Sequence, residues 1–71
     1  MEAMAEDPVK IGAAVRTARK QYRLTQVQLA ELVGLSDRTV RAIEQGSGSP
    51  SLNAVVATLT ALGLRLEVRS S

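Results

Sequence analysis

The chain has 71 residues, of which 45% are hydrophobic and 23% charged, with one aromatic residue and neither cysteine nor histidine. This length allows one small domain with a single core, and the missing Cys and His exclude disulfides, the common soft-metal sites and Cys- or His-based catalysis. We therefore expect no cofactor, no metal site and no enzyme activity. Since a core of this size supplies at most about 3–5 kcal/mol, a second copy of the chain is expected to add stability.

The charges are distributed unevenly along the chain. The net charge is +2, but residues 9–45 carry seven basic and three acidic side chains, whereas residues 1–7 carry three acidic and no basic ones. The basic central region favours an anionic partner. Residues 1–7 are expected to be a flexible acidic N-terminus. They lack the apolar segment of a signal peptide, and no apolar run reaches the roughly 20 residues of a membrane span, so a cytoplasmic protein is expected.

Three helices are predicted in the first two thirds of the chain. Pro8 suits the first position of a helix over residues 8–22, in which apolar side chains recur at intervals of three and four. Thr25 and Gln28 have the spacing of a capping box before a helix over residues 26–33, and Gly34 can adopt the left-handed conformation that ends it. Ser36 then caps a third predicted helix that continues through residue 45.

The last third of the chain combines one helix with a different pattern. A polar Gly/Ser loop over residues 46–50 precedes a predicted helix from near Ser51 to residue 62. After Gly63 the apolar side chains alternate with charged ones, which is typical of a strand, here expected over residues 64–69. Its members with a predicted role in dimerisation are Leu64, Arg65, Leu66, Glu67 and Val68.

A lone strand needs a partner for its backbone hydrogen-bonding groups, and a second copy of the same strand would supply one. In an antiparallel pair centred on Leu66, Arg65 of one chain faces Glu67 of the other, whereas a pair centred on Glu67 places two carboxylates face to face. Charge pairing therefore favours the first register by about 1 kcal/mol. The alternative is a monomer with a frayed tail.

The second and third predicted helices, joined by a turn of three residues, form a candidate helix-turn-helix, in which the second helix of the pair lies in the major groove of DNA. A small residue, Ala30, is needed where the two helices cross, and Gly34 supplies the turn. Val40 and Ile43 face inward and hold the recognition helix against the helix before it. The spacing of these residues is specific to the motif.

The stretch LTQVQLAELVGLSDRTVRAIEQG, residues 24–46, closely resembles the helix-turn-helix of the phage-repressor-like regulators, the Cro-like or XRE family. The resemblance implies an all-α, lambda-repressor-like bundle of four helices that covers residues 8–63. The tail ALGLRLEV resembles the C-terminal strand of HipB-type antitoxins, a subfamily that dimerises through a two-stranded intermolecular sheet. The expected fold is therefore four helices plus this strand.

Geometry and the resemblance together indicate which residues contact DNA bases. Arg38 can bond the O6 and N7 atoms of guanine with its fork of donors. Asp37 can accept a hydrogen bond from cytosine or stabilise the helix dipole, and the sequence leaves both roles open. Ala42 leaves space for a thymine methyl group. The family's base-reading positions are occupied here by Ser36, Asp37, Arg38 and Ala42.

Other polar residues suit the DNA backbone. Gln26 begins the second helix, where backbone N–H groups and an amide side chain can hold a phosphate. The remaining phosphate candidates are Thr39, Arg41, Gln45 and Ser47, with Lys20, Arg23 and Ser49 on the flanks. The resemblance assigns Arg19 and Glu44 to an internal ion pair that maintains the fold, and leaves Lys10 and Arg16 without a role.

The sequence thus predicts a homodimeric, sequence-specific repressor that binds a palindromic operator with half-sites about 34–36 Å apart. The HipB resemblance further implies the antitoxin of a toxin–antitoxin operon, which represses its own promoter and binds a HipA-like serine/threonine kinase toxin. Two alternatives stay open. One is a stand-alone phage-repressor-like regulator, and the other is a protein-interaction module of the same fold that does not bind DNA.

Overall fold

The computed structural model describes residues 7–68 and residue 70. Within them the chain forms four helices, α1 (Asp7–Gln21), α2 (Gln26–Val33), α3 (Asp37–Glu44) and α4 (Leu52–Ala61). The all-helical prediction is confirmed, with helix ends within one residue of the expected positions. Apart from residue 7, the acidic N-terminus predicted from the sequence lies outside the described residues.

Side-chain caps define where the helices begin. Thr25 Oγ1 accepts from the Gln28 amide at 3.0 Å, and Gln28 Oε1 accepts from the Thr25 amide at 2.8 Å, so the predicted capping box is complete. Ser36 and Ser51 cap α3 and α4 with their hydroxyl oxygens, which accept from the Thr39 and Ala54 amides. Gly34 ends α2 with a positive φ of 72°, which a glycine adopts without strain.

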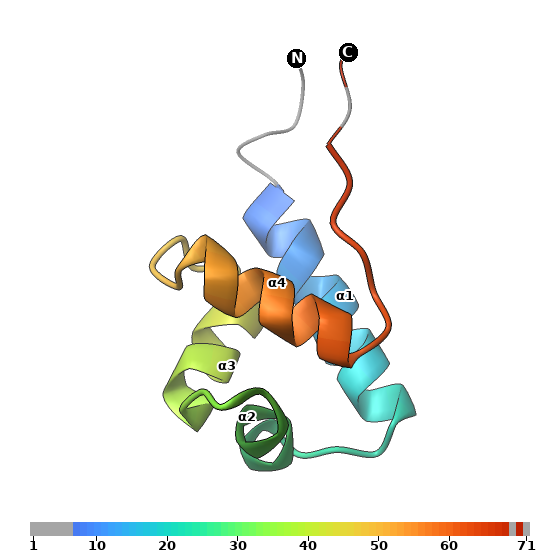
Figure 1. The fold of residues 1–71 in the computed structure, drawn as a ribbon, viewed down its shortest axis with the longest axis vertical. Helices are drawn as coiled ribbons and strands as arrows, with labels where there is room; N and C mark the ends of the chain where they lie inside the picture. Colours follow the sequence, from blue (N-terminus) through green and yellow to red (C-terminus); the bar gives the residue numbers. More distant parts are fainter. Residues whose placement is uncertain (1–6, 69, 71) are drawn as a thin grey trace.

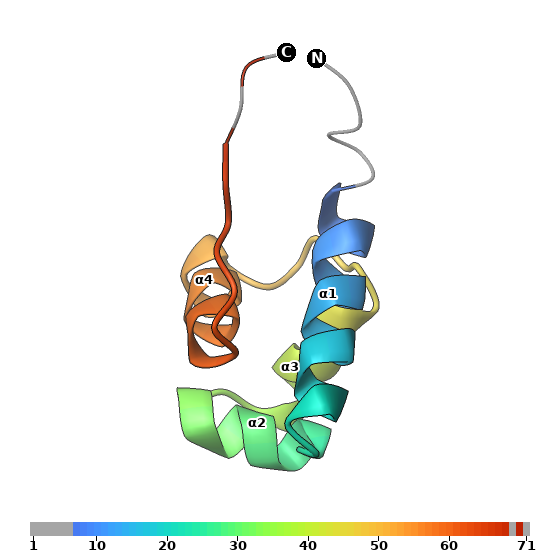
Figure 2. The same cartoon turned by 90° about the vertical axis from the view of Figure 1, so that its right-hand side faces the viewer.

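The core lies between the four helices. Figure 2 shows α1 and α4 on opposite sides, with α3 between them and α2 across one end. The largest fully buried apolar side chains are Val15 of α1, Leu29 of α2 and Val40 of α3, and Leu59 and Leu62 complete the cluster from the side of α4. Each of the four helices thus contributes apolar side chains to one shared core.

Helices α1 and α3 approach each other closely at Gly12. A Cβ atom at this position would lie 2.8 Å from the carbonyl oxygen of Glu44 and still closer to that of Ile43. Only a residue without a side chain allows this backbone contact. Gly12 therefore fixes how near α3 lies to α1, which the sequence pattern did not reveal.

The predicted C-terminal strand is absent from the described residues. After α4 the chain turns at Gly63 and leaves the helix at a steep angle, rising to the level of the beginning of α1 (Figure 1). The described residues show no strand pairing at Leu64, Arg65, Leu66, Glu67 or Val68. The physical reason is that a strand requires a neighbouring strand, and a single all-helical chain offers none. Residue 69, the last of the expected strand, lies outside the described residues.

This C-terminal segment, residues 64–68, is nevertheless partly anchored. The Leu64 amide donates to the Leu59 carbonyl at 2.8 Å, and the Leu64 side chain packs against the core. Leu66 is 38% exposed and Val68 is 96% exposed. Apolar side chains in this segment therefore remain in contact with water in the single chain. None of the helices described here has the length and apolar character required to cross a membrane.

Candidate nucleic-acid interface

Helices α2 and α3 form the helix-turn-helix that the sequence predicted. Three residues separate them, and the Leu35 amide donates to the Ala30 carbonyl at 2.9 Å, which closes the turn. Leu29 and Ala30 are buried on the inner side of α2, and Val40 and Ile43 are buried on the inner side of α3. Because these side chains interlock, α3 is held with its opposite face toward solvent.

The outer face of α3 carries the predicted base-reading residues. Arg38 is exposed near the beginning of the helix, and Ala42, one turn later, is half-buried. Ser36 is exposed as well, but its hydroxyl caps the Thr39 amide at 3.1 Å and lies 2.9 Å from the Thr39 hydroxyl. In the described part of the chain, Arg38 is thus the long side chain of this face whose donors make no hydrogen bond or ion pair. It stands near the beginning of α3, the end of a recognition helix that generally contacts base edges.

Asp37 pairs with Arg41 one turn along α3. The Arg41 Nη2 atom donates to Asp37 Oδ2 at 3.1 Å, with about half of each side chain exposed. Asp37 is also the acidic residue of the first helical turn, where a negative charge stabilises the helix dipole. The structure gives Asp37 an intrahelical partner. The i, i+4 spacing of the two residues was the signal in the sequence that could have found this pair.

A buried polar network joins the first three helices. Arg19 of α1 donates to both carboxylate oxygens of Glu44 of α3, from Nε at 2.6 Å and from Nη2 at 3.1 Å, and its Nη1 donates to the Leu24 carbonyl at 2.8 Å. Gln26, the first residue of α2, donates from Nε2 to Glu44 Oε1 at 3.1 Å. The side chains of Arg19 and Glu44 are only 11% and 4% exposed. The structure therefore brings Arg19 and Glu44 together, and adds Gln26 to them.

The network keeps Glu44 ionised. Burial alone would raise its pKa, but the hydrogen bonds from Arg19 and Gln26, with the positive charges of Arg19 and Arg16, outweigh burial and hold the pKa of Glu44 below its ordinary value. The hydrogen bond to Glu44 likewise raises the pKa of Arg19, against the opposing effect of burial. Both partners thus remain charged, which gives the bidentate contact its strength.

Beside this network lies a surface depression of about 410 Å³, which we call the basic hollow. Three helices contribute to it. Its lining residues are Arg16, Arg19, Gln26, Arg41, Glu44 and Gln45. The structure thus gathers three predicted phosphate-contacting residues, Gln26, Arg41 and Gln45, at one place. It also adds Arg16, which sequence reasoning left unassigned because its neighbours come from helices distant in the chain.

The other predicted phosphate residues lie outside this hollow. Thr39 is half-buried and takes part in the cap of α3, and Ser47 is exposed in the loop after α3, where its hydroxyl lies 2.9 Å from that of Ser49. Lys20 and Arg23 are exposed at the end of α1 and in the turn that follows it. None of these residues lines the basic hollow.

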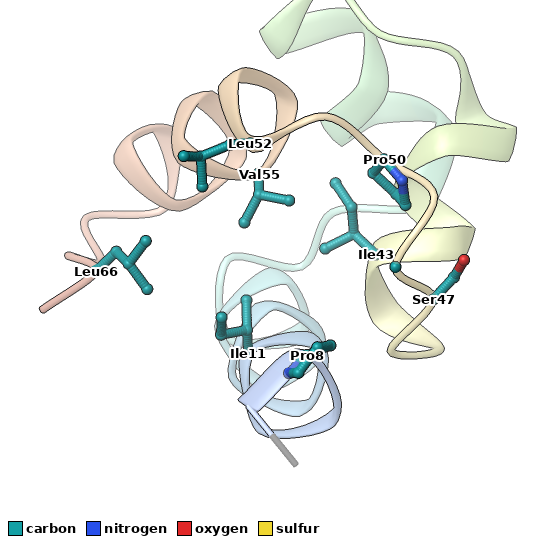
Figure 3. A pocket seen from close by; sticks show the side chains of 9 residues that line it. Pro8, Ile11, Ile43, Ser47, Pro50, Leu52, Val55 and Leu66 are labelled. Atoms are coloured by element: carbon teal, nitrogen blue, oxygen red, sulfur yellow. The ribbon is translucent and has the colours of Figure 1, made fainter. Parts of the chain in front are cut away.

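A second depression, of about 220 Å³, is apolar and shares no lining residue with the basic hollow. Figure 3 shows it from close by. We call it the apolar hollow. Ile11 of α1, Leu52 and Val55 of α4, and Leu66 point toward it from three sides, and Pro8 and Pro50 lie at its rim. Leu66 of the C-terminal segment thus forms part of its wall. Among the described residues, no group of three or more acidic side chains is placed to hold a metal ion.

Comparison with known proteins agrees with this geometry. Residues 15–68 match the helix-turn-helix family. The chain is 39% identical over 56 residues to the immunity repressor protein of Bacillus phage phi105, an alignment that covers 79% of this chain and 39% of that repressor. The chain therefore spans about two fifths of the phage protein.

Two further relatives are covered more fully. The chain is 45% identical over 49 residues to an uncharacterized HTH-type transcriptional regulator of Methanothermobacter thermautotrophicus, which covers 69% of this chain and 71% of the relative. The chain is also 33% identical over 61 residues to an uncharacterized HTH-type transcriptional regulator of Sinorhizobium fredii. This alignment covers 86% of this chain and 80% of the relative. By these matches, and by the packing of α2 against α3, the chain belongs to the helix-turn-helix family of XRE-type DNA-binding transcriptional regulators.

Proposed function

We propose that this chain is a sequence-specific, DNA-binding transcriptional repressor in which α3 enters the major groove. The observation that carries the proposal is the arrangement of α3, whose inner face is locked by Val40 and Ile43 while Arg38 is exposed. Arg41, three residues after Arg38 on the same helix, lines the basic hollow. A rigid helix with a long arginine side chain at its exposed beginning suits hydrogen bonding to guanine. Positively charged side chains near it suit contacts with the phosphates of the DNA backbone. The similarity to a phage immunity repressor agrees with this function.

The base contacts are assigned to four residues, of which Arg38 contributes most. Ser36, Asp37 and Ala42 occupy the neighbouring positions. Since Asp37 accepts a hydrogen bond from Arg41, we propose that its main role is to position the Arg41 side chain and to stabilise the first turn of α3. Phosphate contacts are assigned to Gln26, Thr39, Arg41, Gln45 and Ser47.

We further propose that the repressor acts as a homodimer joined through residues 64–69. Leu66 and Val68 remain exposed in the single chain, and the alternating Arg65 and Glu67 would pair across a two-fold axis centred on Leu66. Residues 8–63 would then be the DNA-binding domain and residues 64–69 a dimerisation strand. Such a dimer would read a palindrome with half-sites about 34–36 Å apart and repress by blocking polymerase.

The DNA-binding proposal is tested by fluorescence anisotropy with a duplex from immediately upstream of the protein's own gene and a scrambled duplex of equal length. Binding to the upstream duplex should weaken steeply with salt. Arg38→Ala should relax specificity at one base position, at a cost of about 1–3 kcal/mol on the preferred base. Lys10→Ala, which removes a charge near the start of α1, is the matched control. Salt-insensitive binding without sequence preference would contradict the proposal and favour an interaction module instead.

The dimer is tested by sedimentation of the full chain. Leu66→Asp places a carboxylate at the centre of the proposed strand pair and should shift the equilibrium toward monomer. Leu32→Asp changes a side chain on α2 that is 66% exposed, so it controls for the loss of an apolar surface group. A Leu66→Asp protein that sediments as a dimer at the wild-type concentration would rule out the strand pair.

An antitoxin role is the finer proposal. It rests on the resemblance of residues 61–68 to the HipB tail, and the extended course of residues 64–68 after α4, in place of another helix, agrees with it. The neighbouring gene provides the test. A HipA-like kinase encoded beside this gene, whose product co-purifies with this chain, would support an autoregulating antitoxin. Its absence would leave a stand-alone phage-repressor-like regulator.

A further inference from the structure

The basic hollow is built differently from a patch of surface charges. The buried Arg19–Glu44 pair forms part of its lining, and three helices contribute side chains to it. Both oxygens of the Glu44 carboxylate are already engaged, Oε2 by Arg19 and Oε1 by Arg19 and Gln26. The one carboxylate in the lining therefore presents little negative charge to an incoming anion. Its ionisation instead holds Arg19 and Gln26 in fixed positions.

The remaining cations of the basic hollow are Arg16 and Arg41. Arg41 shares its charge with Asp37 at 3.1 Å. Arg16 is exposed, and in the described part of the chain it makes no ion pair within 4.0 Å, although its charge acts on Glu44 at longer range. Arg16 is thus the guanidinium of the hollow that is least neutralised by carboxylates. Its five donors suit a phosphate oxygen in a forked contact.

The position of the hollow connects it with DNA. Gln26 begins α2, where the backbone N–H groups of the first turn point outward. Asp37, Arg41 and Gln45 follow one another at intervals of one turn along the side of α3, and Arg41 and Gln45 line the hollow. A duplex that receives the beginning of α3 in its major groove therefore carries a strand of phosphates past this side of the helix.

We propose that the basic hollow holds one phosphate of the DNA backbone and that Arg16 of α1 is its principal cation, assisted by Gln26 and Arg41. The proposal rests on the DNA-binding function proposed above, and extends the contact surface from α2 and α3 to the middle of α1. In this arrangement the buried Arg19–Glu44 pair positions Gln26 and contributes no direct contact. Arg16 reads no base, since its role is to neutralise the backbone.

The test measures the affinity of the full chain for the upstream duplex and the scrambled duplex across a salt series. Since one phosphate contact contributes about 0.9 to the slope of log K against log salt, Arg16→Gln should lower that slope by this amount per bound protomer. If the two proteins bind equally at 1 M salt, this slope difference makes Arg16→Gln bind about eightfold more weakly than the wild type at 0.1 M salt. The loss should be equal for both duplexes. Arg16→Lys should retain most of the slope because the charge is kept.

Lys10→Gln removes the same charge from the same helix outside the basic hollow, and should leave the slope near that of the wild type. Thermal melts followed by circular dichroism check that each variant is folded. If the wild type binds the upstream duplex but Arg16→Gln has the same affinity and slope, the phosphate site is wrong and the repressor proposal stands. A loss confined to one duplex would make Arg16 a base-reading residue and also overturn the site. If the wild type shows no salt-dependent binding, both proposals fail.

Discussion

Helices α1, α2 and α3 are joined in a different way from α4 and the C-terminal segment. On the first side, Arg19, Gln26 and Glu44 link three helices by hydrogen bonds that are directional and buried. On the second side, the described side-chain hydrogen bonds of α4 stay within the helix and its cap. Thr58 Oγ1 donates to the Ala54 carbonyl, and Ser51 Oγ accepts from the Ala54 amide. Apart from the backbone hydrogen bond from Leu64 to Leu59, α4 and the C-terminal segment are held by apolar contacts.

The difference follows from what each side has to position. The base readout proposed for α3 would require its beginning to lie within a fraction of an ångström of the productive geometry, and directional bonds restrict both distance and angle. Apolar packing requires mainly that side chains fill the space between the elements, and it tolerates small shifts in the positions of those side chains. The side of α4 can therefore leave Leu52, Val56 and Val68 exposed, which is a surface suited to another protein chain.

The largest effect is expected where the backbones of α1 and α3 touch. Gly12→Ala would place a methyl group against the Ile43 and Glu44 carbonyls, and we expect it to destabilise the fold by about 3 kcal/mol despite the better helix propensity of Ala. For a domain of this size that lowers the Tm by about 12–24 °C. Gly48→Ala is the control, because no atom beyond its two chain neighbours lies within 4 Å of the added Cβ. Equal melting temperatures for the two variants would show that α1 and α3 can separate without cost.

The next effect is expected from the buried ion pair. Glu44→Gln leaves Arg19 partly buried without its carboxylate, and should cost about 2 kcal/mol in urea unfolding at pH 7. The pKa of Glu44 is lowered in the folded state from an ordinary value of 4.5. Its contribution is therefore complete above that ordinary value and is lost as the pH falls through the lowered pKa. The gap between wild type and Glu44→Gln should close over this acidic range. A gap independent of pH would show that the charge of Glu44 does not stabilise the fold.

Local chemistry explains what the sequence could predict. The caps Thr25 and Ser36 satisfy backbone groups of their own helices, so the helix-turn-helix is specified within residues 24–46. The roles of Gly12 and Arg16 could not be predicted in this way. Each depends on a helix about 10–30 residues away in the chain, and neither a lone glycine nor a lone arginine in a helix indicates which helix crosses it.

The C-terminal segment shows a different limit of prediction from the sequence. Alternation of apolar and charged residues after Gly63 is typical of a strand, yet the described residues form none. A helix satisfies its backbone groups within one segment, whereas a strand requires a second segment beside it. The strand indicated by Leu64, Leu66 and Val68 can therefore form only beside a second strand from a partner chain. The two-stranded sheet stays a prediction for the dimer.

The charges of that proposed sheet give a smaller effect. In the register centred on Leu66, Glu67→Arg places the introduced guanidinium opposite Arg65 of the other chain, which should weaken dimerisation by about 1 kcal/mol for each of the two contacts. The double variant Arg65→Glu with Glu67→Arg exchanges the two charges and should restore the wild-type dissociation constant in sedimentation equilibrium. If the double variant is no better than the single one, the two residues do not face each other and the register is wrong.

The smallest effect is expected at Thr58, the buried polar side chain of α4. Its hydroxyl donates to the Ala54 carbonyl at 2.8 Å, and no atom of the side chain is exposed. Thr58→Val removes this bond, but the Ala54 carbonyl keeps its place in the hydrogen-bond ladder of the helix, and a methyl group fills the space. We therefore expect a change in unfolding free energy of about 0.5 kcal/mol in either direction. A loss as large as that of Glu44→Gln would mean that α4 also depends on directional bonds, and the contrast between the two sides would not hold.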